Sequence, residues 1–533
     1  MTILSVRDLT VTFGKGTVSA IKSIDFDVFA NETLCIIGES GSGKSTTAFA
    51  LLGLLPGSAE LTGSVVYRSE ELVGLPEAGM NRIRGKKIAM IFQEPMTALN
   101  PVMTVGQQIA EPLVQHMGMS ESAARREALK LLDVVRIPEP EQRSRQYPHE
   151  LSGGMRQRVM IAMALACEPD ILIADEPTTA LDVTIQAEIL DLIKEIQKDR
   201  GLSVMFITHD LGVVARIADR VIVMLDGQIV ETGNARQIFN APKHDYTRKL
   251  LSAALRADSV KVVCSGETGS DVLMAVEGIT KTYPGARSGF LQPRVPVHAV
   301  RGISFVLRKG ETLGVVGESG CGKTTLSRCI LNLVRPTSGR ILFEGRDITD
   351  QDEASWRELR KKVQIVFQDP YSSLNPRLTV GRALAEPLKV HKGLSFHQAL
   401  PMVKELLSEV GLPDDAVDRY PHEFSGGQRQ RIVIARALVL EPDLIIADEE
   451  VSALDVTIQA QILKLLKDIQ ARRGLSFIFI THDLAVLRDF CDRALVLHKG
   501  EVVEEGAVEE LFTSPREDYT RRLRDAAPIP EIA

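Results

Sequence analysis

The sequence lacks the features that mark several other classes of protein. Its 533 residues include 63 lysines and arginines against 70 aspartates and glutamates, so it has no basic excess of the kind that binds nucleic acid. No uncharged apolar run reaches about 18 residues, and residues 1–10 do not form a signal peptide. We therefore expect a soluble globular protein that does not itself span a membrane, so that any membrane role comes through partners.

Cysteine is also scarce. The six cysteines show no C-x-x-C spacing, and most lie in apolar or motif segments, where a reduced thiol packs as a small apolar side chain. This pattern favours a reducing compartment such as the cytosol.

The chain is too long for a single core, and an internal repeat divides it in two. At about 150 residues per domain, the length alone predicts three or four folding units. Equivalent residues such as Glu176 and Glu449 lie 273 positions apart, which favours two halves, each with a nucleotide-binding core and a smaller helical insertion. We place the first domain at residues 1–256, a polar linker at 257–270 and the second domain at 271–533, each domain ending in a C-terminal extension.

The strongest motif is a glycine-rich loop that occurs twice. Gly38–Ser45 (GESGSGKS) follows the apolar run Thr33–Ile37, and Gly317–Thr324 (GESGCGKT) follows Thr312–Val316. These runs predict buried strands, and the residues after the first loop predict a helix over Thr46–Leu55. A strand, a loop of this pattern and a helix together form the context that phosphate binding requires.

The chemistry of the loop explains its composition. Glycines allow backbone N–H groups to point at phosphates, the helix N-terminus adds the positive end of its dipole, Lys44 adds a charge and the Ser45 hydroxyl is a ligand for Mg²⁺. The loop residues expected to bind ATP are Gly38, Ser40, Gly41, Gly43, Lys44, Ser45 and Thr46 in the first half, and Gly317, Ser319, Gly320, Gly322, Lys323, Thr324 and Thr325 in the second.

Acidic residues follow buried strands in both halves. Asp175 and Asp448 each end a nearly continuous apolar run, where an ionised carboxylate is costly unless it is paired or near a metal, so we expect them to hold Mg²⁺; a capping aspartate is the alternative. Glu176 and Glu449 come next and are expected to accept a proton from the attacking water.

Further polar and aromatic residues recur at equivalent positions. His209 and His482 end the next strand, as Ile-Thr-His-Asp, and are expected to contact the γ-phosphate. Gln93 and Gln368 are expected to link Mg²⁺ or the attacking water to the helical insertion. Two aromatic residues, Phe13 and Tyr283, are candidate platforms for adenine, with packing in the core as an equal alternative.

A second anion-binding motif distinguishes this chain from other nucleotide-binding enzymes. The segments Leu151–Met155 (LSGGM) and Phe424–Gln428 (FSGGQ) precede helical runs expected at Arg156–Ala166 and Arg429–Val439, so backbone N–H groups and a helix dipole are again presented to an anion. Two cradles per half indicate that each nucleotide is sandwiched between the halves. The residues expected to complete the sites are Ser152, Gly153, Gly154, Ser425, Gly426 and Gly427.

Together these motifs resemble the ATP-binding cassette (ABC) ATPases, twice over and across nearly the whole chain. Leu-Asp follows the Asp-Glu pair in both halves, at 181–182 and 454–455. The segments 93–101, 368–376 and 242–247, together with Tyr-Pro-His-Glu before both signatures, resemble the dipeptide, oligopeptide and nickel importer subfamily. Carrying both cassettes on one chain is similar to the ATPases of microcin C/peptide importers and of glutathione importers, and the modest length favours the former.

The resemblance implies an α/β fold with two tandem P-loop nucleotide-binding domains, each with a RecA-like core and a helical subdomain that includes helices near 120–135 and 395–410. It implies a head-to-tail sandwich of the two cassettes around ATP and Mg²⁺, with Ser45, Gln93 and Asp175 as metal ligands in one site and Thr324, Gln368 and Asp448 in the other. The implied partners are two transmembrane permease subunits and a periplasmic or extracellular substrate-binding protein, without nucleic acid. The implied location is peripheral, on the cytoplasmic face of the inner membrane.

Three departures from the family pattern qualify this prediction. The proline of the usual Asp-Glu-Pro is replaced by Glu450, and the usual signature glutamine is replaced by Met155. In the expected sandwich both replacements fall in the same site. Glu450 adds negative charge beside Glu449 and removes the rigidity of proline, which predicts a misplaced base or one with a raised pKa. We therefore hypothesise that the Lys44 site is the faster, with neutral drift as the alternative. Only Cys264 follows the first core, so no iron–sulfur cluster is predicted.

Two other classes remain as alternatives. A twin-cassette ATPase acting on ribosomes or nucleic acid shares the duplicated motifs, but the short linker and acidic balance disfavour it. A P-loop kinase or GTPase does not explain the two Ser-Gly-Gly signatures. The transported substrate is not evident from the sequence: peptides, glutathione, a peptide antibiotic and nickel all remain open.

Overall fold

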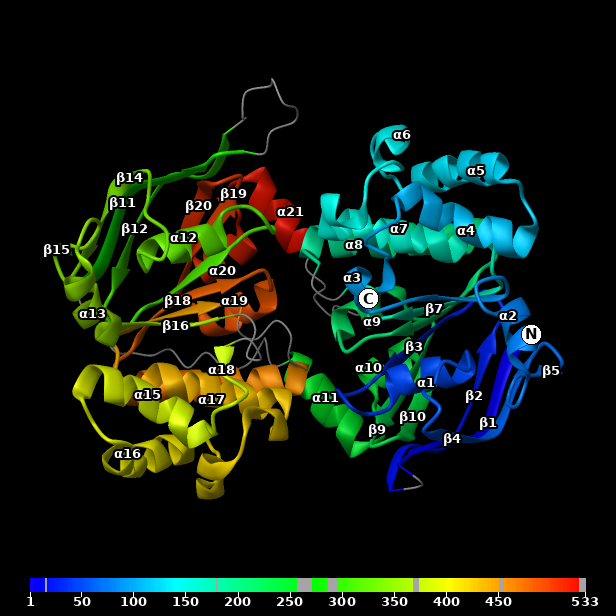
Figure 1. Cartoon of the computed structure of the whole chain (residues 1–533), viewed down its shortest axis with the longest axis horizontal. Helices are drawn as coiled ribbons and strands as arrows, with labels where there is room; N and C mark the ends of the chain where they lie inside the picture. The colour runs from blue at the N-terminus through cyan, green and yellow to red at the C-terminus, as the bar shows by residue number, and fades with distance from the viewer. Residues whose placement is uncertain are drawn as a thin grey trace. The chain divides into compact units, whose positions relative to one another are not determined.

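The computed structural model describes residues 1–14, 17–178, 181–255, 271–285, 296–367, 373–449 and 455–526, and the statements below concern these residues. They form two compact units, one made chiefly of residues up to Leu255 and the other chiefly of residues from Asp271 on (Figure 1). The predicted linker at 257–270 lies outside the described residues. The placement of the domain boundaries there stays our proposal.

The strands described in the first unit form two sheets. One is four-stranded and antiparallel, in the order β2-β1-β4-β5, and the other is six-stranded, in the order β10-β9-β3-β8-β7-β6. The second sheet is parallel except for the pairing of β9 with β10. The bounds are β1 (Thr2–Phe13), β2 (Val18–Phe29), β3 (Thr33–Ile37), β4 (Ala59–Tyr67), β5 (Glu70–Glu71), β6 (Ile88–Ile91), β7 (Ile171–Asp175), β8 (Ser203–Ile207), β9 (Arg220–Leu225) and β10 (Gln228–Asn234).

The helices described in the first unit pack with the sheets or form a separate helical layer. Contacts among α3, α4, α5 and α7 build that layer, which lies between β6 and β7 in sequence, as expected for the helical subdomain (Figure 1). The bounds are α1 (Lys44–Leu51), α2 (Glu77–Ile83), α3 (Pro95–Ala98), α4 (Val105–Met117), α5 (Glu121–Val134), α6 (Pro140–Arg143), η1 (Pro148–Glu150), α7 (Gly153–Leu165), α8 (Val183–Arg200), α9 (Leu211–Ile217), α10 (Ala235–Asn240) and α11 (Asp245–Leu255).

The second unit repeats this architecture in its described residues. Its sheets have the orders β12-β11-β14-β15 and β16-β17-β18-β13-β19-β20, which match the first unit strand for strand. The strand bounds are β11 (Val272–Tyr283), β12 (Val297–Arg308), β13 (Thr312–Val316), β14 (Ser338–Phe343), β15 (Arg346–Asp347), β16 (Val363–Val366), β17 (Leu444–Asp448), β18 (Ser476–Thr481), β19 (Arg493–His498) and β20 (Glu501–Ala507).

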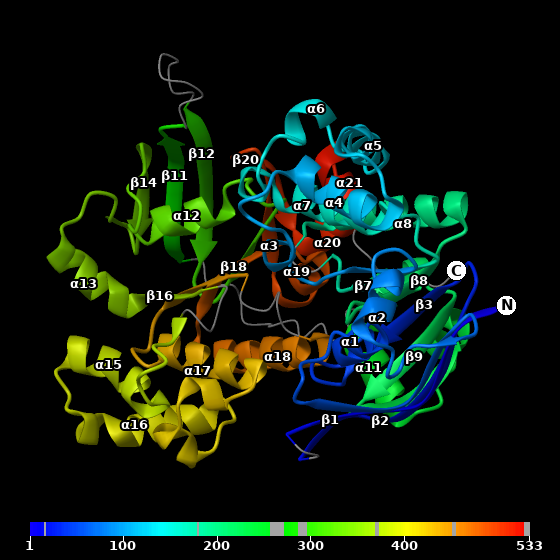
Figure 2. The same ribbon diagram turned by 45° about the vertical axis from the view of Figure 1, so that its right-hand side comes forward.

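Its helices also repeat the pattern, and α15, α16 and α17 lie side by side in both views (Figures 1 and 2). The helix bounds are α12 (Lys323–Ile330), α13 (Glu353–Lys362), α15 (Val380–Lys392), α16 (Phe396–Glu409), η3 (Asp414–Asp418), η4 (Pro421–Glu423), α17 (Gly426–Leu438), α18 (Val456–Arg473), α19 (Leu484–Phe490), α20 (Val508–Thr513) and α21 (Asp518–Ala526). Within the described parts of the chain, no helix is both long and apolar enough to cross a membrane.

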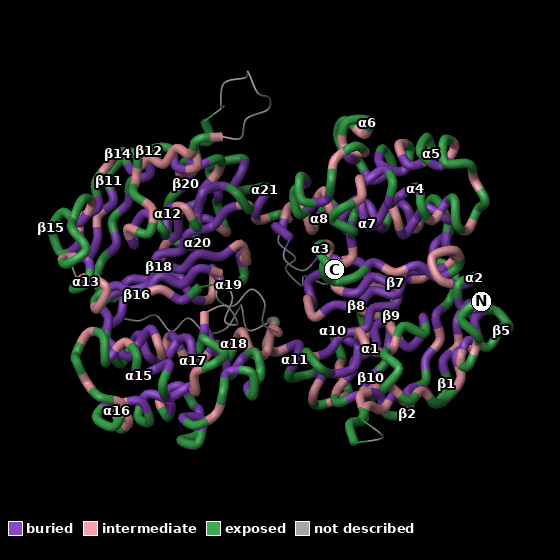
Figure 3. The backbone as a smooth tube through the Cα atoms, viewed as in Figure 1, coloured by how far each residue is buried: buried purple, intermediate pink, exposed green. Residues whose placement is uncertain are grey.

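The central parallel strands are buried on both faces. All five residues of β3 are buried, and successive side chains enter different apolar clusters: Ile36 packs into one, and Cys35 and Ile37 into the other. Figure 3 shows the same continuous burial along β7 and β8. Covering both faces explains why these strands are uninterrupted apolar runs and not alternating ones.

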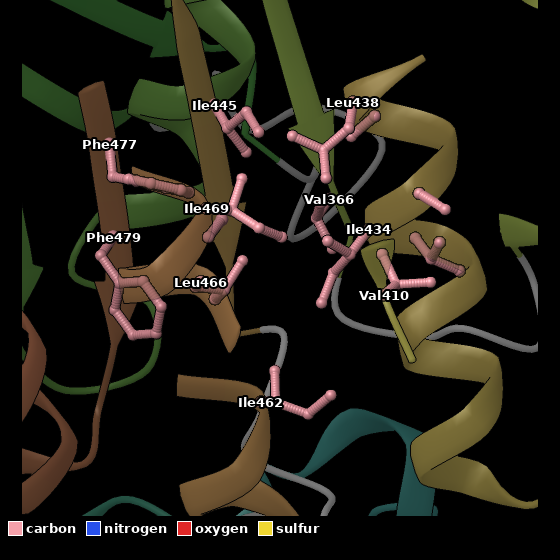
Figure 4. Close-up of a cluster of buried hydrophobic side chains, with 14 of the residues drawn as sticks. Val366, Val410, Ile434, Leu438, Ile445, Ile462, Leu466, Ile469, Phe477 and Phe479 are labelled. Atoms are coloured by element: carbon pink, nitrogen blue, oxygen red, sulfur yellow. The ribbon is translucent and has the colours of Figure 1, made fainter. Parts of the chain in front are cut away.

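The equivalent core of the second unit joins sheet and helices. Figure 4 shows Phe477 and Phe479 of β18 facing side chains of α18. On α18, Ile462, Leu466 and Ile469 follow the i, i+4, i+7 spacing of one helix face. Leu466 is 1% exposed, so truncating it to alanine is expected to cost about 2–5 kcal/mol of unfolding free energy.

Most predicted elements are confirmed, but the bounds of three predicted helices were wrong. The helix after the first phosphate loop starts at Lys44 and ends at Leu51, because Gly53 adopts a left-handed φ of 59° and breaks the helix before Leu55. The signature helices start at Gly153 and Gly426, and the preceding serines are the capping residues, so the glycines form the first turn and do not precede it.

Candidate functional site

The first phosphate loop is a tight backbone structure between β3 and α1. Lys44 is 5% exposed, and its Nζ donates hydrogen bonds to the carbonyls of Gly38 at 2.8 Å and Glu39 at 2.9 Å. The second loop repeats these contacts, with Lys323 donating to Gly317 and Glu318 at 2.6 and 3.1 Å. The loop is therefore closed on its own lysine, which sits at the N-terminus of the following helix.

The glycines of the loop are required by a close approach of backbones. A Cβ atom on Gly38 would lie 2.3 Å from the carbonyl oxygen of Met224, and one on Gly43 would lie 2.7 Å from that of Ala20. Both glycines also have positive φ values, 153° and 98°, which other residues rarely adopt. Gly317 and Gly322 in the second loop meet the same obstacles. The other predicted loop residues, Ser40, Gly41, Thr46, Ser319, Gly320, Thr324 and Thr325, are exposed or half-buried.

The aspartates at the strand ends differ in their partners. Asp175 is 2% exposed and accepts a hydrogen bond from Ser45 Oγ at 3.0 Å; burial raises its pKa to about 6. The pKa of Asp448 is also raised, first by burial and then by the charge of Glu449. In the second cassette the hydroxyl near this carboxylate is that of Ser327, at 3.4 Å. Sequence reasoning missed Ser327. The available signal was that the two halves differ at this position, because the equivalent residue in the first half is an alanine.

The predicted base of the first cassette is held by two predicted neighbours. Gln93 Nε2 donates to Glu176 Oε2 at 2.9 Å, and His209 Nδ1 lies 3.0 Å from Glu176 Oε1. Glu176 has a φ of 46°, in the left-handed region that costs a glutamate energy. The structure thus brings these three residues together at the end of the parallel sheet, beside Asp175.

The predicted base of the second cassette lies near an imidazole and a lysine. Glu449 Oε1 lies 3.5 Å from His482 Nδ1 and 3.8 Å from Lys323 Nζ. Burial works in the opposite direction, but the hydrogen bond and charge of His482, and then the charge of Lys323, lower the pKa of Glu449. This differs from the raised pKa expected from Glu450, because a cation and an imidazole face the carboxylate. Gln368 and Glu450 lie outside the described residues.

The signature segments begin helices in both units. The Ser152 hydroxyl accepts a hydrogen bond from the backbone N–H of Met155 at 3.3 Å, and the Ser425 hydroxyl accepts one from Gln428 at 3.4 Å. Only the second has a reciprocal bond, in which Gln428 Oε1 accepts from the Ser425 N–H at 3.1 Å. Methionine at 155 has no oxygen for this bond, so the first signature lacks one half of its capping box.

The two candidate adenine platforms are half-buried ends of strands. Phe13 ends β1 and packs against an apolar cluster, and Tyr283 ends β11 with Lys281 Nζ 5.2 Å from its ring centroid. Both the platform and the packing interpretation fit these positions, so the adenine contact stays a prediction.

Sequence reasoning missed one tyrosine in each unit. The hydroxyl of Tyr246 accepts a hydrogen bond from the Glu39 N–H at 3.0 Å, and that of Tyr519 accepts one from the Glu318 N–H at 3.2 Å. The available signal was the repeat of Asp-Tyr-Thr near the end of each half, at 245–247 and 518–520.

Five of the six cysteines lie in the described residues. The five described cysteines are free and buried, and Cys264 lies outside the described residues. Among the described histidines, cysteines and acidic residues, no group of three or more is arranged to hold a metal ion. The predicted magnesium ligands are a different set, because they include hydroxyl and amide oxygens.

Comparison with known proteins defines the class of this chain. A model of the ABC transporter family matches residues 21–179 and 300–452, and a model of the oligopeptide/dipeptide transporter C-terminal region matches residues 230–270. The chain therefore belongs to the ABC transporter family, with two cassettes. It is an ATP-binding and ATP-hydrolysing subunit of the importer class, which implies membrane permease partners.

Particular relatives match it over almost its full length. It is 48% identical over 570 residues to the glutathione import ATP-binding protein GsiA of Escherichia coli (strain K12), covering 99% of this chain and 90% of that protein. It is 47% identical over 561 residues to the protein of the same name from Pectobacterium atrosepticum, with the same coverage. These names give no support to an ATPase acting on ribosomes.

Single-cassette structures are also similar. One is cbiO1 from Clostridium perfringens, part of the ABC transporter complex cbiONQ, which is 30% identical and covers 46% of this chain and 92% of that chain, with a TM-score of 0.40.

Proposed function

We propose that this chain hydrolyses ATP to drive the uptake of glutathione or related small peptides across the inner membrane. The observation that carries the proposal is its similarity, over 99% of its length, to a glutathione import ATP-binding protein. The match of residues 230–270 to an oligopeptide/dipeptide transporter region supports the same substrate class.

The chain is proposed to act with two transmembrane permease subunits and a substrate-binding protein, at the cytoplasmic face of the membrane and without nucleic acid. Its two cassettes are proposed to pair head to tail, so that each phosphate loop works with the signature of the other cassette. Duplicated loops and signatures on one chain support this arrangement, since each nucleotide then has two cradles of N–H groups.

Each phosphate loop is proposed to bind the β- and γ-phosphates of ATP. Lys44 and Lys323 now donate to loop carbonyls, and a phosphate oxygen is a stronger, charged acceptor for the same ammonium groups. Ser152, Gly153 and Gly154 would face the nucleotide of the Lys323 site. Ser425, Gly426 and Gly427 would face that of the Lys44 site.

Magnesium fits the oxygen donors of these sites. The carboxylate of Asp175 and the hydroxyl of Ser45 are hard oxygen ligands that lie side by side. Burial raises the pKa of Asp175, and a bound divalent cation would offset the cost of ionising this carboxylate. Ser45, Asp175 and Gln93 would hold the ion in the first site, and Thr324, Asp448 and Gln368 in the second. When bound, the ion neutralises negative charge on the phosphate oxygens.

Glu176 and Glu449 are proposed to accept the proton of the attacking water. A positioned base contributes about 10²–10⁴-fold to the rate. Gln93 and His209 hold the Glu176 carboxylate from two sides, which fixes its direction before the water arrives. His209 and His482 are proposed to contact the γ-phosphate as well, so that base and phosphate are aligned by the same imidazole.

The proposal is tested by recovering the tagged chain from detergent-solubilised membranes of its native host and identifying the proteins that copurify. Two multi-spanning proteins, with or without a binding protein, are the expected result. Recovery with ribosomes and without membrane proteins would overturn it.

Substrate class is tested by the uptake of labelled glutathione and of a labelled dipeptide into cells that lack the chain. Complementation by the unmodified chain should restore uptake, and complementation by the double variant Lys44→Ala, Lys323→Ala should not. If the unmodified chain restores uptake of the dipeptide alone, glutathione is not the substrate.

A further inference from the structure

A tyrosine of each C-terminal extension contacts the phosphate loop of its own cassette. We define the extensions as residues 235–255 and 508–526, which contain α10 with α11 and α20 with α21. Tyr246 in the first turn of α11 bonds the N–H of Glu39, and Tyr519 in the first turn of α21 bonds the N–H of Glu318. The contact therefore occurs twice, on independent copies of the fold.

The bonded peptide group belongs to the part of the loop that holds the lysine. Glu39 donates its N–H to Tyr246, while its carbonyl accepts a hydrogen bond from Lys44 at 2.9 Å. Glu318 does the same between Tyr519 and Lys323. One residue thus joins the phenol hydroxyl to the ammonium group, and the hydroxyl limits how far the start of the loop can move.

The extension is itself fixed to the sheet. Both oxygens of Glu231 on β10 accept backbone N–H groups just before α11, from Lys243 at 2.8 Å and from His244 at 3.0 Å. Leu250 and Leu251 of α11 are buried in the core of the unit. The tyrosine therefore stands on a rigid support, which a positioning group requires.

The second unit has the same support and a more buried tyrosine. Glu504 accepts the N–H groups of Arg516 at 2.8 Å and Glu517 at 3.2 Å. Tyr519 is 7% exposed, and its ring centroid lies 4.1 Å from that of His498. Water has little access to replace the phenol there, so its loss leaves the Glu318 N–H poorly satisfied.

We propose that Tyr246 and Tyr519 are positioning residues for ATP, which fix the first peptide of each phosphate loop from the C-terminal extension. This inference rests on the proposed function in that the loops bind ATP. It gives the extension a direct part in nucleotide binding, beyond the similarity of residues 230–270 to a transporter region of the family.

The experiment uses the full chain with one functional loop at a time. Tyr246→Phe is placed in a Lys323→Ala background and Tyr519→Phe in a Lys44→Ala background, and the Kd for ATP is measured by equilibrium titration. Loss of one neutral hydrogen bond predicts roughly 2- to 10-fold weaker binding, and a KM for ATP that rises by more than kcat falls. Tyr67→Phe is the matched control, because Tyr67 is also buried but bonds Asp170, which precedes β7 at the end opposite Asp175.

The melting temperature without nucleotide separates positioning from simple support of the fold. We expect it to fall no further in Tyr246→Phe and Tyr519→Phe than in Tyr67→Phe, while only the first two lose affinity for ATP. Equal Kd values in all variants, or a loss in Tyr67→Phe of the same size, would overturn the inference. If the unmodified single-loop chains bind no ATP, the proposed function fails instead.

Discussion

The Nδ1 atom of His209 lies 3.0 Å from Oε1 of Glu176. The equivalent distance in the second cassette, from His482 to Glu449, is 3.5 Å, and Lys323 Nζ lies 3.8 Å from the same carboxylate. A carboxylate that faces a cation and an imidazole has a lowered pKa, and a weaker base accepts a proton less readily. In the expected sandwich, Met155 and Glu450 also fall in the Lys323 site, and we therefore expect the two sites to turn over ATP at different rates.

Unequal sites predict unequal losses on removing each base. Glu176→Gln should lower ATP turnover by about 10²-fold or more, and Glu449→Gln by less than about 10-fold, because the Lys44 site carries most of the flux. Steady-state ATPase assays of the two purified variants measure this directly. Equal losses would contradict the hypothesis and favour neutral drift at Met155 and Glu450.

The buried carboxyl of Asp175 predicts a pH dependence of stability in the protein without nucleotide or metal. Its folded pKa, raised to about 6, lies above the unfolded value of about 3.9, so its contribution is fully present below pH ~4 and is lost as the pH rises through about 6. The loss amounts to about 3 kcal/mol.

Denaturant unfolding in EDTA at pH 5 and pH 8 tests this for the unmodified chain and for Asp175→Asn. The variant should lose clearly less stability than the unmodified chain between the two pH values, and Asp133→Asn, which changes an exposed residue of α5, should behave like the unmodified chain. Parallel curves for the unmodified chain and Asp175→Asn would show that this carboxyl does not titrate in the expected range.

Gly38→Ala should abolish ATP binding by the first loop. Its new Cβ would lie 2.3 Å from the carbonyl oxygen of Met224, so the loop must move, at a cost of at least about 2 kcal/mol. Gly57→Ala is the control, because a Cβ there meets no atom within 4 Å. Nucleotide titration and thermal melts of both variants check the prediction, and normal ATP affinity in Gly38→Ala would refute it.

Glu231→Gln should loosen the first C-terminal extension. An amide side chain has one acceptor oxygen, so it can satisfy only one of the two N–H groups that Glu231 now accepts, at a cost of about 1–3 kcal/mol. Hydrogen exchange of α11 should quicken, while Glu60→Gln, on the exposed edge of β4, should leave it unchanged. Unaltered exchange in Glu231→Gln would mean that the extension is held chiefly by its apolar face.

The sequence predicted two of the central parallel strands with their observed bounds, because burial on both faces makes an unbroken apolar run. These are Thr33–Ile37 and Thr312–Val316, whose local composition reflects burial on both faces. The predictions of helix ends were less accurate. In the helix after the first phosphate loop, the apolar pattern continues to Leu55, but the backbone turns at Gly53. The contacts of Ser327 and of the two tyrosines were not predicted, because their partners are distant in sequence. The sequence marks only the residues themselves, through an alanine at the position equivalent to Ser327 and through the repeat of Asp-Tyr-Thr.

The contact between Tyr246 and Glu39 also sets an order of events during synthesis. The two residues are 207 positions apart, and a chain that emerges N-terminus first presents the phosphate loop long before the tyrosine. The loop therefore acquires its last hydrogen bond only when nearly the whole cassette has left the ribosome. At that moment Gly317 has not been made, so the first phosphate loop is complete before the second begins to form, while the signature proposed to face it, at residues 425–427, is made later still.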